Sequence, residues 1–147
     1  MADGVFNIAK GAWAEMIRDG AAAVGVLLLK VAEAEDTLNN YDTIADMLAG
    51  ANTECDFTNY ARKTGLTGSI AVDDTNNRVD GDIPDQTWAS AGGATNNSIV
   101  RAITFYENAA ADATRIPMTY QDLVSTTDGS DLTAQMNASG IARAAAA

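Results

Sequence analysis

The sequence predicts a mainly β protein of the α+β class, folded as an antiparallel β-sandwich or barrel-like domain. Three observations carry this prediction. From residue 55 onward, apolar and polar residues alternate with a period of two. Gly, Asn, Asp and Thr interrupt the alternation every ten to fifteen residues or so. Only one segment, near residues 40–50, has clear helical spacing. We expect a single β-rich domain over residues 21–147, preceded by an N-terminal arm over residues 1–20.

The arm contains apolar residues that allow two interpretations. Trp13, Met16 and Ile17 have the i, i+3, i+4 spacing of a helix, but Gly11 and Gly20 limit that helix to about two turns. An extended arm that packs against a neighbouring subunit explains the same residues equally well. The sequence leaves this choice open.

Residues 24–31 form a short apolar run whose length and valines favour a strand covered on both faces. The longest apolar stretch, Gly20–Leu29, is about half the roughly 20 residues that a membrane-spanning helix needs. We therefore expect no membrane partner.

One short helix is expected near residues 40–50. Its apolar residues recur at spacings of three and four. They are Leu38, Tyr41, Ile44, Ala45 and Leu48. Asn40 or Asp42 is expected to cap the first turn, and Gly50 to supply a left-handed stop.

Residues 69–83 are expected to form a β-hairpin. Apolar residues alternate with small or polar ones on both sides of a turn over residues 73–77, where Asp and Asn side chains favour reversal of the chain. Pro84 then ends the ladder or places it on a sheet edge.

Further strands are expected in the second half of the chain. Residues 98–106 follow a Gly- and Asn-rich loop over residues 91–97 and are apolar on both faces, which indicates a central strand. Alternation resumes over residues 116–120 and, after a turn at residues 128–131, over residues 132–138. In the central strand, one face is expected to carry Ile99, Ile103 and Phe105, and the other Val100, Ala102 and Tyr106.

The end of the chain is rich in alanine. Residues 144–147 carry no turn or charge signal, so we expect them to fray or to lie along a partner. Alanine supplies 29 of the 147 residues, so few large apolar side chains remain to build a core. Such a chain gains stability by burying surface against partners.

The charge of the chain excludes several functions. It has 9 Lys+Arg against 20 Asp+Glu, a formal charge of −11. An acidic chain repels polyphosphate, so we expect no nucleic-acid partner. Because there is no histidine, Ser-His and Cys-His nucleophile systems and the commonest zinc ligand are missing.

The start lacks the basic and apolar regions of a secretory signal, so we expect a soluble protein made in a reducing cytoplasm.

Carboxylates are the candidates for chemistry. Five aspartates lie in and after the hairpin turn, and Asp128 and Asp131 bracket another turn. Such turns can bind calcium, but the spacing does not match an EF-hand, and Asx residues favour turns for conformational reasons. We expect no metal, no cofactor, no catalytic residue and no enzymatic activity.

Two other residue types receive structural interpretations. The single Cys55 cannot form an intramolecular disulfide and is expected to be a small, partly buried apolar side chain, with a reactive thiol as the alternative. Trp88 is expected to be a buried anchor, with an exposed sugar-stacking platform as the alternative.

Several short segments follow one another in a distinctive order. They are Phe6-Asn7-Ile8-Ala9-Lys10-Gly11, Asp73-Asp74-Thr75-Asn76, Asp85-Gln86-Thr87-Trp88, Gly92-Gly93-Ala94-Thr95-Asn96-Asn97, Ile116-Pro117-Met118-Thr119 and Asp128-Gly129-Ser130-Asp131-Leu132-Thr133-Ala134. In this order the chain resembles a family of small virion proteins of tailed bacteriophages, encoded with the head genes. The resemblance spans most of the chain, although none of the segments is a mechanistic motif.

The resemblance implies a structural role as a capsid decoration (cement) protein. Such a protein binds the major capsid protein on the outer shell as a homo-oligomer, typically a trimer, so we expect a virion protein at the capsid surface. A head-fibre, neck or tail component is an alternative. A carbohydrate-binding module that uses Trp88 and residues 92–97 is another. The candidate subunit or capsid contacts are Phe6, Ile8, Trp13, Ile141 and Arg143.

Overall fold

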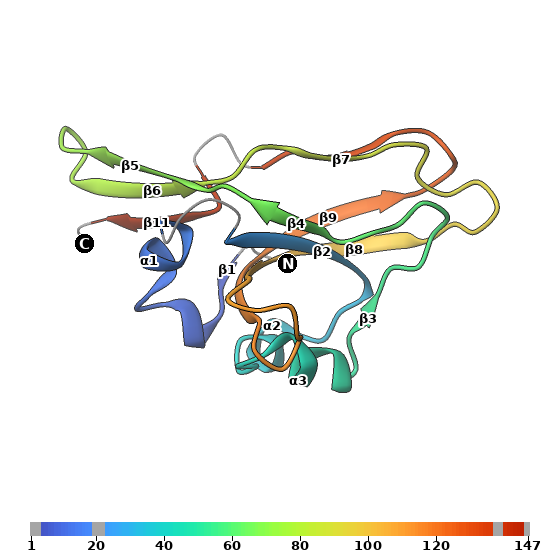
Figure 1. Ribbon diagram of the computed structural model, residues 1–147, viewed down its shortest axis with the longest axis horizontal. Helices are drawn as coiled ribbons and strands as arrows, with labels where there is room; N and C mark the ends of the chain where they lie inside the picture. Colours follow the sequence, from blue (N-terminus) through green and yellow to red (C-terminus); the bar gives the residue numbers. More distant parts are fainter. Residues whose placement is uncertain (1–3, 19–22, 137–139, 146–147) are drawn as a thin grey trace.

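The computed structural model describes residues 4–18, 23–136 and 140–145, and it confirms a mainly β, β-sandwich-like fold built from antiparallel sheets (Figure 1). The strands are β1 (Gly4–Val5), β2 (Val24–Val31), β3 (Thr53–Glu54), β4 (Lys63–Leu66), β5 (Ser69–Asp73), β6 (Arg78–Asp82), β7 (Gln86–Trp88), β8 (Ser98–Tyr106), β9 (Ile116–Thr126), β10 (Leu132–Ala134) and β11 (Ala142–Ala145). The helical segments are η1, a 3-10 turn (Asn7–Ala9), α1 (Trp13–Arg18), α2 (Glu35–Leu38) and α3 (Ile44–Ala49). Among the described residues, no helix has the length and hydropathy to cross a membrane.

The central sheet has the strand order β1-β9-β8-β2-β3, and β4 also pairs with β2. The long strands β2, β8 and β9 form its middle, and their pairings are antiparallel. β2 is buried over its first six residues, which confirms the predicted strand with two covered faces. β8 lies between β2 and β9, which confirms the predicted central strand.

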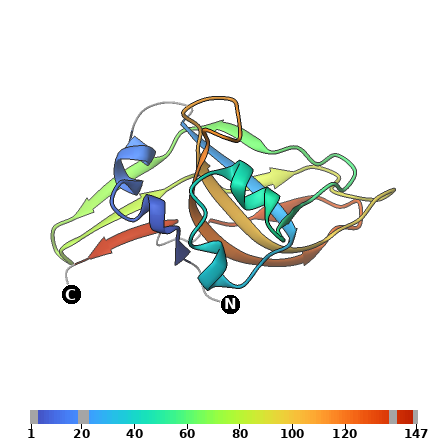
Figure 2. The same ribbon diagram turned by 90° about the horizontal axis from the view of Figure 1, so that it is seen from below.

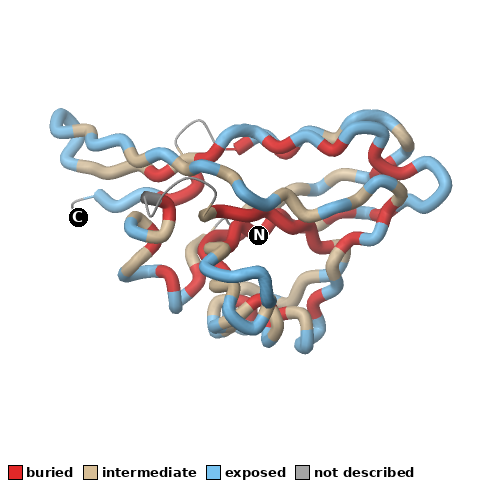
Figure 3. The backbone as a smooth tube through the Cα atoms, in the orientation of Figure 1, coloured by how far each residue is buried: buried red, intermediate tan, exposed pale blue. Residues whose placement is uncertain are grey.

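Two layers cover this sheet. The small sheet β7–β10 lies over one face, and α2 and α3 lie against the other (Figures 1 and 2). Alternate residues of β2 therefore enter two clusters: Val24, Val26 and Leu28 face the first, and Leu27 and Leu29 face the second. Figure 3 shows the buried backbone concentrated along these central strands.

A β-bulge changes the faces that alternation assigns to β8. Ile99 pairs with Ser125 and Arg101 with Asp122, so two β9 residues lie opposite Val100 alone. Ile99 consequently packs in the first cluster, and Val100 packs against the second. The faces predicted for Ile99 and Val100 are therefore wrong. Side chains alternate regularly between the two faces of a sheet only where the strand pairing is regular, and the bulge interrupts that pairing.

The helix expected near residues 40–50 is confirmed as α3, but the predicted apolar stripe is shared between α2 and α3. Thr43, and not Asn40 or Asp42, caps α3: its Oγ1 accepts a backbone N–H of the first turn at 3.0 Å. Gly50 has φ −74°, so the expected left-handed stop is wrong. A side chain at Gly50 would instead collide with the Tyr41 hydroxyl.

The two ends of the described chain fold onto its body. α1 forms a helix over Trp13–Arg18, so this part of the N-terminal segment is not an extended arm. β11 pairs with β6 of the same chain, so Ala144 and Ala145 lie along their own sheet; a contact of this sheet edge with a partner stays a prediction.

The hairpin over residues 69–83 is confirmed as β5–β6, with a turn over residues 74–77. The strand predicted over residues 132–138 is shorter than expected, since β10 ends at Ala134. Residues 137–139 lie outside the described residues.

Candidate interaction surface

Strands β5, β6 and β11 form a three-stranded sheet, the projecting sheet, which extends away from the body of the molecule (Figures 1 and 2). Asp73 shapes the turn at its tip, because Asn76 donates its backbone N–H (3.1 Å) and its side-chain amide (2.7 Å) to the Asp73 carboxylate. These hydrogen bonds hold the pKa of Asp73 below its ordinary value. Asn77 closes the turn with φ 49°, a left-handed conformation that asparagine tolerates.

Strand pairing divides the projecting sheet into two faces. Cross-strand partners share a face, and Val72 pairs with Val79, which pairs with Ala144. The apolar face consists of Ile70, Val72, Val79, Gly81, Ala142 and Ala144. The charged face contains Asp73, Arg78, Asp80, Asp82 and Arg143.

The basic residues of the charged face are held by acids of the same sheet. Arg78 Nε lies 3.1 Å from a carboxylate oxygen of Asp73 and 3.1 Å from one of Asp80. Arg143 Nε lies 2.6 Å from the other Asp80 oxygen. This face therefore provides its own charge compensation.

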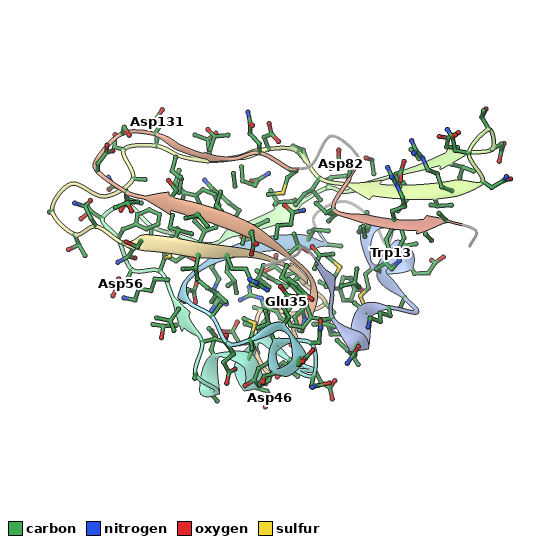
Figure 4. All side chains as sticks on the ribbon, turned by 180° about the vertical axis from the view of Figure 1, so that it is seen from behind. Trp13, Glu35, Asp46, Asp56, Asp82 and Asp131 are labelled. Atoms are coloured by element: carbon green, nitrogen blue, oxygen red, sulfur yellow. The ribbon has the colours of Figure 1, made fainter. Side chains whose placement is uncertain are left out.

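The apolar face is covered only at its base. α1 packs there against β5 and β6, and Trp13, buried where α1 meets the sheet (Figure 4), lies so close to Gly81 that a Cβ atom would come within 2.5 Å of its ring. Beyond α1 no described element covers the face, and Val72 is 67% exposed. An open hollow of about 350 Å³, the tip hollow, is lined by Val72, Asp74, Asn77, Arg78, Val79, Ala144 and Ala145.

The structure brings three of the five predicted contact residues to the projecting sheet. Trp13 and Ile141 are buried there within this chain, and Arg143 lies on the charged face. Phe6 and Ile8 lie elsewhere. Phe6 is buried edge-on against Tyr120, with ring centroids 5.5 Å apart. Ile8, on η1, is 40% exposed. The contact role of all five stays a prediction.

Sequence reasoning missed the tip hollow, although it found the hairpin that carries most of it. The alternation of Ile70 and Val72 marks one apolar face of the hairpin. It does not say how far along that face a covering helix reaches.

A dense charge cluster outside the projecting sheet is structural. Arg62 binds both carboxylate oxygens of Glu54 (2.7 and 2.6 Å) and both of Asp112 (2.6 and 3.0 Å). Arg115 adds a 3.0 Å bond to Asp112. The hydrogen bonds from Arg62 and then Arg115 hold the pKa of Asp112 below its ordinary value. This ion network joins the start of β4 to the loop before β9.

The remaining candidates behave as structural residues. Cys55 is more fully buried than the partly buried residue expected, and burial raises the pKa of its thiol to about 12. Trp88 is the predicted buried anchor: its Nε1 donates to the Ala61 carbonyl at 2.7 Å, so its ring is no exposed platform for a sugar. In the 128–131 turn, Ser130 donates to Asp128. Over the described ranges, no three acidic or thiol side chains converge on a point where a metal could bind.

The fold and this surface define a small, acidic, mainly β protein whose projecting sheet is open at its tip. Comparison with protein-family models, with curated proteins and with solved structures found no match.

Proposed function

We propose that this chain is a structural virion protein of a tailed bacteriophage, a capsid decoration (cement) protein that binds the outer shell and stabilises it. Its partners are the major capsid protein and further copies of itself, as a trimer. It is made in the host cytoplasm and located at the capsid surface, and it is not an enzyme.

The observation that carries this proposal is the projecting sheet, with an apolar tip that the described part of the chain leaves open. The exposed Val72 lies beside Val79 and Ala144 on the same face, and together they offer apolar surface for such a contact. The acidic surface also fits a subunit that stays soluble before assembly and keeps away from packaged DNA. The resemblance of the ordered segments to phage head proteins supports the same function.

Co-sedimentation tests the proposal. Purified protein is mixed with expanded capsids that lack it, and we expect it to pellet with them and to raise the temperature at which they release DNA, because a ligand of the assembled shell stabilises that state. We expect light scattering of the free protein to give the mass of a trimer. Protein that stays in the supernatant and is monomeric would contradict the proposal.

A head-fibre, neck or tail location is the second candidate, and copy number separates the two. A decoration protein matches the copy number of the shell, whereas a ring component matches the symmetry of the neck. Quantitative mass spectrometry of purified particles measures this ratio. The carbohydrate-binding alternative loses its stacking residue, because Trp88 is buried.

A further inference from the structure

We propose that the tip hollow is the surface that meets the shell, and that it accepts a protein segment presenting an aliphatic side chain next to a lysine or arginine. This assignment rests on the proposed function and names the part of the molecule that performs it.

The floor of the hollow is apolar and continuous across three strands. Val72 of β5, Val79 of β6 and Ala144 of β11 are cross-strand neighbours on one face. Arg78 of β6 also lines the hollow, but its guanidinium is already paired with Asp73 and Asp80. Arg143 pairs with Asp80 on the charged face. An aliphatic side chain can therefore enter the hollow without stripping water from an unpaired charge on its floor.

The rim of the hollow supplies a negative charge. Asp74 is exposed, and within the described ranges its carboxylate makes no hydrogen bond or ion pair, whereas Arg78 on the same rim is held by Asp73 and Asp80. The whole chain adds its formal charge of −11. A cation beside the entering apolar side chain fits this rim, because complementary charge favours both encounter and orientation.

A second copy of the chain fits the hollow poorly. Docked tip to tip, it would bring a second exposed Asp74 to the same rim, and like charges at close range oppose association. The charge of the rim therefore favours the shell partner in the hollow and leaves contacts between subunits to other surfaces.

The test compares two exposed valines on two different strands. Val72→Lys removes an apolar contact and opposes a cationic partner. Val124→Lys makes the same charge change on β9, at a valine that is 86% exposed. In co-sedimentation with expanded capsids, we expect Val72→Lys to bind at least about tenfold more weakly than wild type, since a valine side chain contributes about that much when buried. We expect Val124→Lys to bind like wild type.

A second variant tests the rim. We expect Asp74→Asn to weaken capsid binding at low salt and to bind like wild type at high salt, where the charge is screened. Thermal melts of all three variants should match wild type, because the substituted side chains are exposed.

Each outcome supports or overturns the assignment of the tip hollow to the shell. If Val72→Lys binds capsids like wild type, or if Val124→Lys loses as much binding, the hollow is not the contact. If Val72→Lys changes the mass of the free protein in light scattering, the hollow holds a second copy and the assignment to the shell is overturned. If wild-type protein itself does not bind, the proposed function fails and the assignment fails with it.

Discussion

At the scale of single residues, Arg101 is the feature that pattern analysis could not anticipate. It is 0% exposed in the middle of β8, although its side chain ends in a guanidinium group. One terminal nitrogen, Nη2, lies 3.2 Å from Asp122 on β9 and 3.6 Å from Glu35 on α2, and the guanidinium centre lies 4.8 Å from the centroid of the Tyr120 ring. Arg101 thus links the central sheet to the helical layer. The adjacent bulge shifts the register of the pairing so that Asp122 of β9 lies directly opposite Arg101.

We expect Arg101→Ala to destabilise the protein by about 3 kcal/mol, because it removes a buried cation, its aromatic contact and the partner of two carboxylates. Urea unfolding monitored by circular dichroism measures the change. Arg143→Ala is the matched control: its ion pair with Asp80 lies on a more exposed side chain, so the loss should stay below about 1 kcal/mol. Equal losses for the two variants would contradict this account.

At the scale of elements, α1 packs against the base of the projecting sheet and stabilises its position. Trp13 and Ile17 are buried against β6 at Gly81, and Ile17 also approaches Gly68, just before β5. The absence of a side chain at Gly81 lets the helix come close, and this close packing holds the base of the sheet to the body of the molecule.

We expect Gly81→Ala to destabilise the protein by about 2 kcal/mol, since its methyl group would lie 2.5 Å from Trp13 Cζ3 and 2.8 Å from Ile17 Cδ1. Thermal unfolding monitored by tryptophan fluorescence measures the loss. Gly11→Ala is the control, because a methyl group there meets nothing within 4 Å. A Gly81→Ala variant as stable as Gly11→Ala would show that the close packing of α1 on Gly81 does not stabilise the sheet.

The ion network around Arg62 links two loops and makes stability depend on pH. The pKa of Asp112 is lowered in the folded state, so its contribution is present above the unfolded value of about 3.9 and is lost as the pH falls through the folded value. The contribution is therefore complete above about pH 5 and disappears progressively below about pH 4.

We expect Asp112→Asn to be less stable than wild type at pH 7, and the difference between the two proteins to narrow as the pH falls below about 4. Urea unfolding at a series of pH values from about 7 to about 3 measures this difference in the free energy of unfolding. The control is Asp74→Asn, at an exposed carboxylate that pairs with no cation in the described part of the chain. If the difference in stability between Asp112→Asn and wild type stays constant with pH, the ion network is not its cause.

At the scale of the whole molecule, the two apolar clusters share one sheet. Val26 and Leu28 of β2 enter the first cluster, and Leu27 and Leu29 enter the second. A change on one side of the sheet is therefore transmitted to the other through the same strands. Both tryptophans, Trp13 and Trp88, belong to the first cluster.

We expect Phe6→Ala, in the second cluster, to lower the urea midpoint reported by tryptophan fluorescence as much as the midpoint reported by circular dichroism. The cavity should cost about 3 kcal/mol, and unfolding should remain one transition because the clusters share their strands. Val124→Ala, at an exposed valine, should leave both midpoints in place. A fluorescence midpoint that does not move would mean that the clusters unfold independently.

The sequence by itself determined the local structure. Continuous apolar residues mark β2 and β8 as buried strands, the Asx turn marks the β5–β6 hairpin, and helical spacing marks α3, because each of these signals depends on neighbours within a few residues. The burial of Cys55 and Trp88 was predictable from residue type and local context for the same reason.

Only the tertiary structure decided how these pieces meet. The bulge opposite Val100, the pairing of β11 with β6 and the reach of α1 along the projecting sheet all depend on residues distant in the chain. Among the described residues, none of α1 lines the tip hollow, and β11 completes the face beside Val79. A period-two pattern states which residues share a face. What covers that face is set by long-range packing.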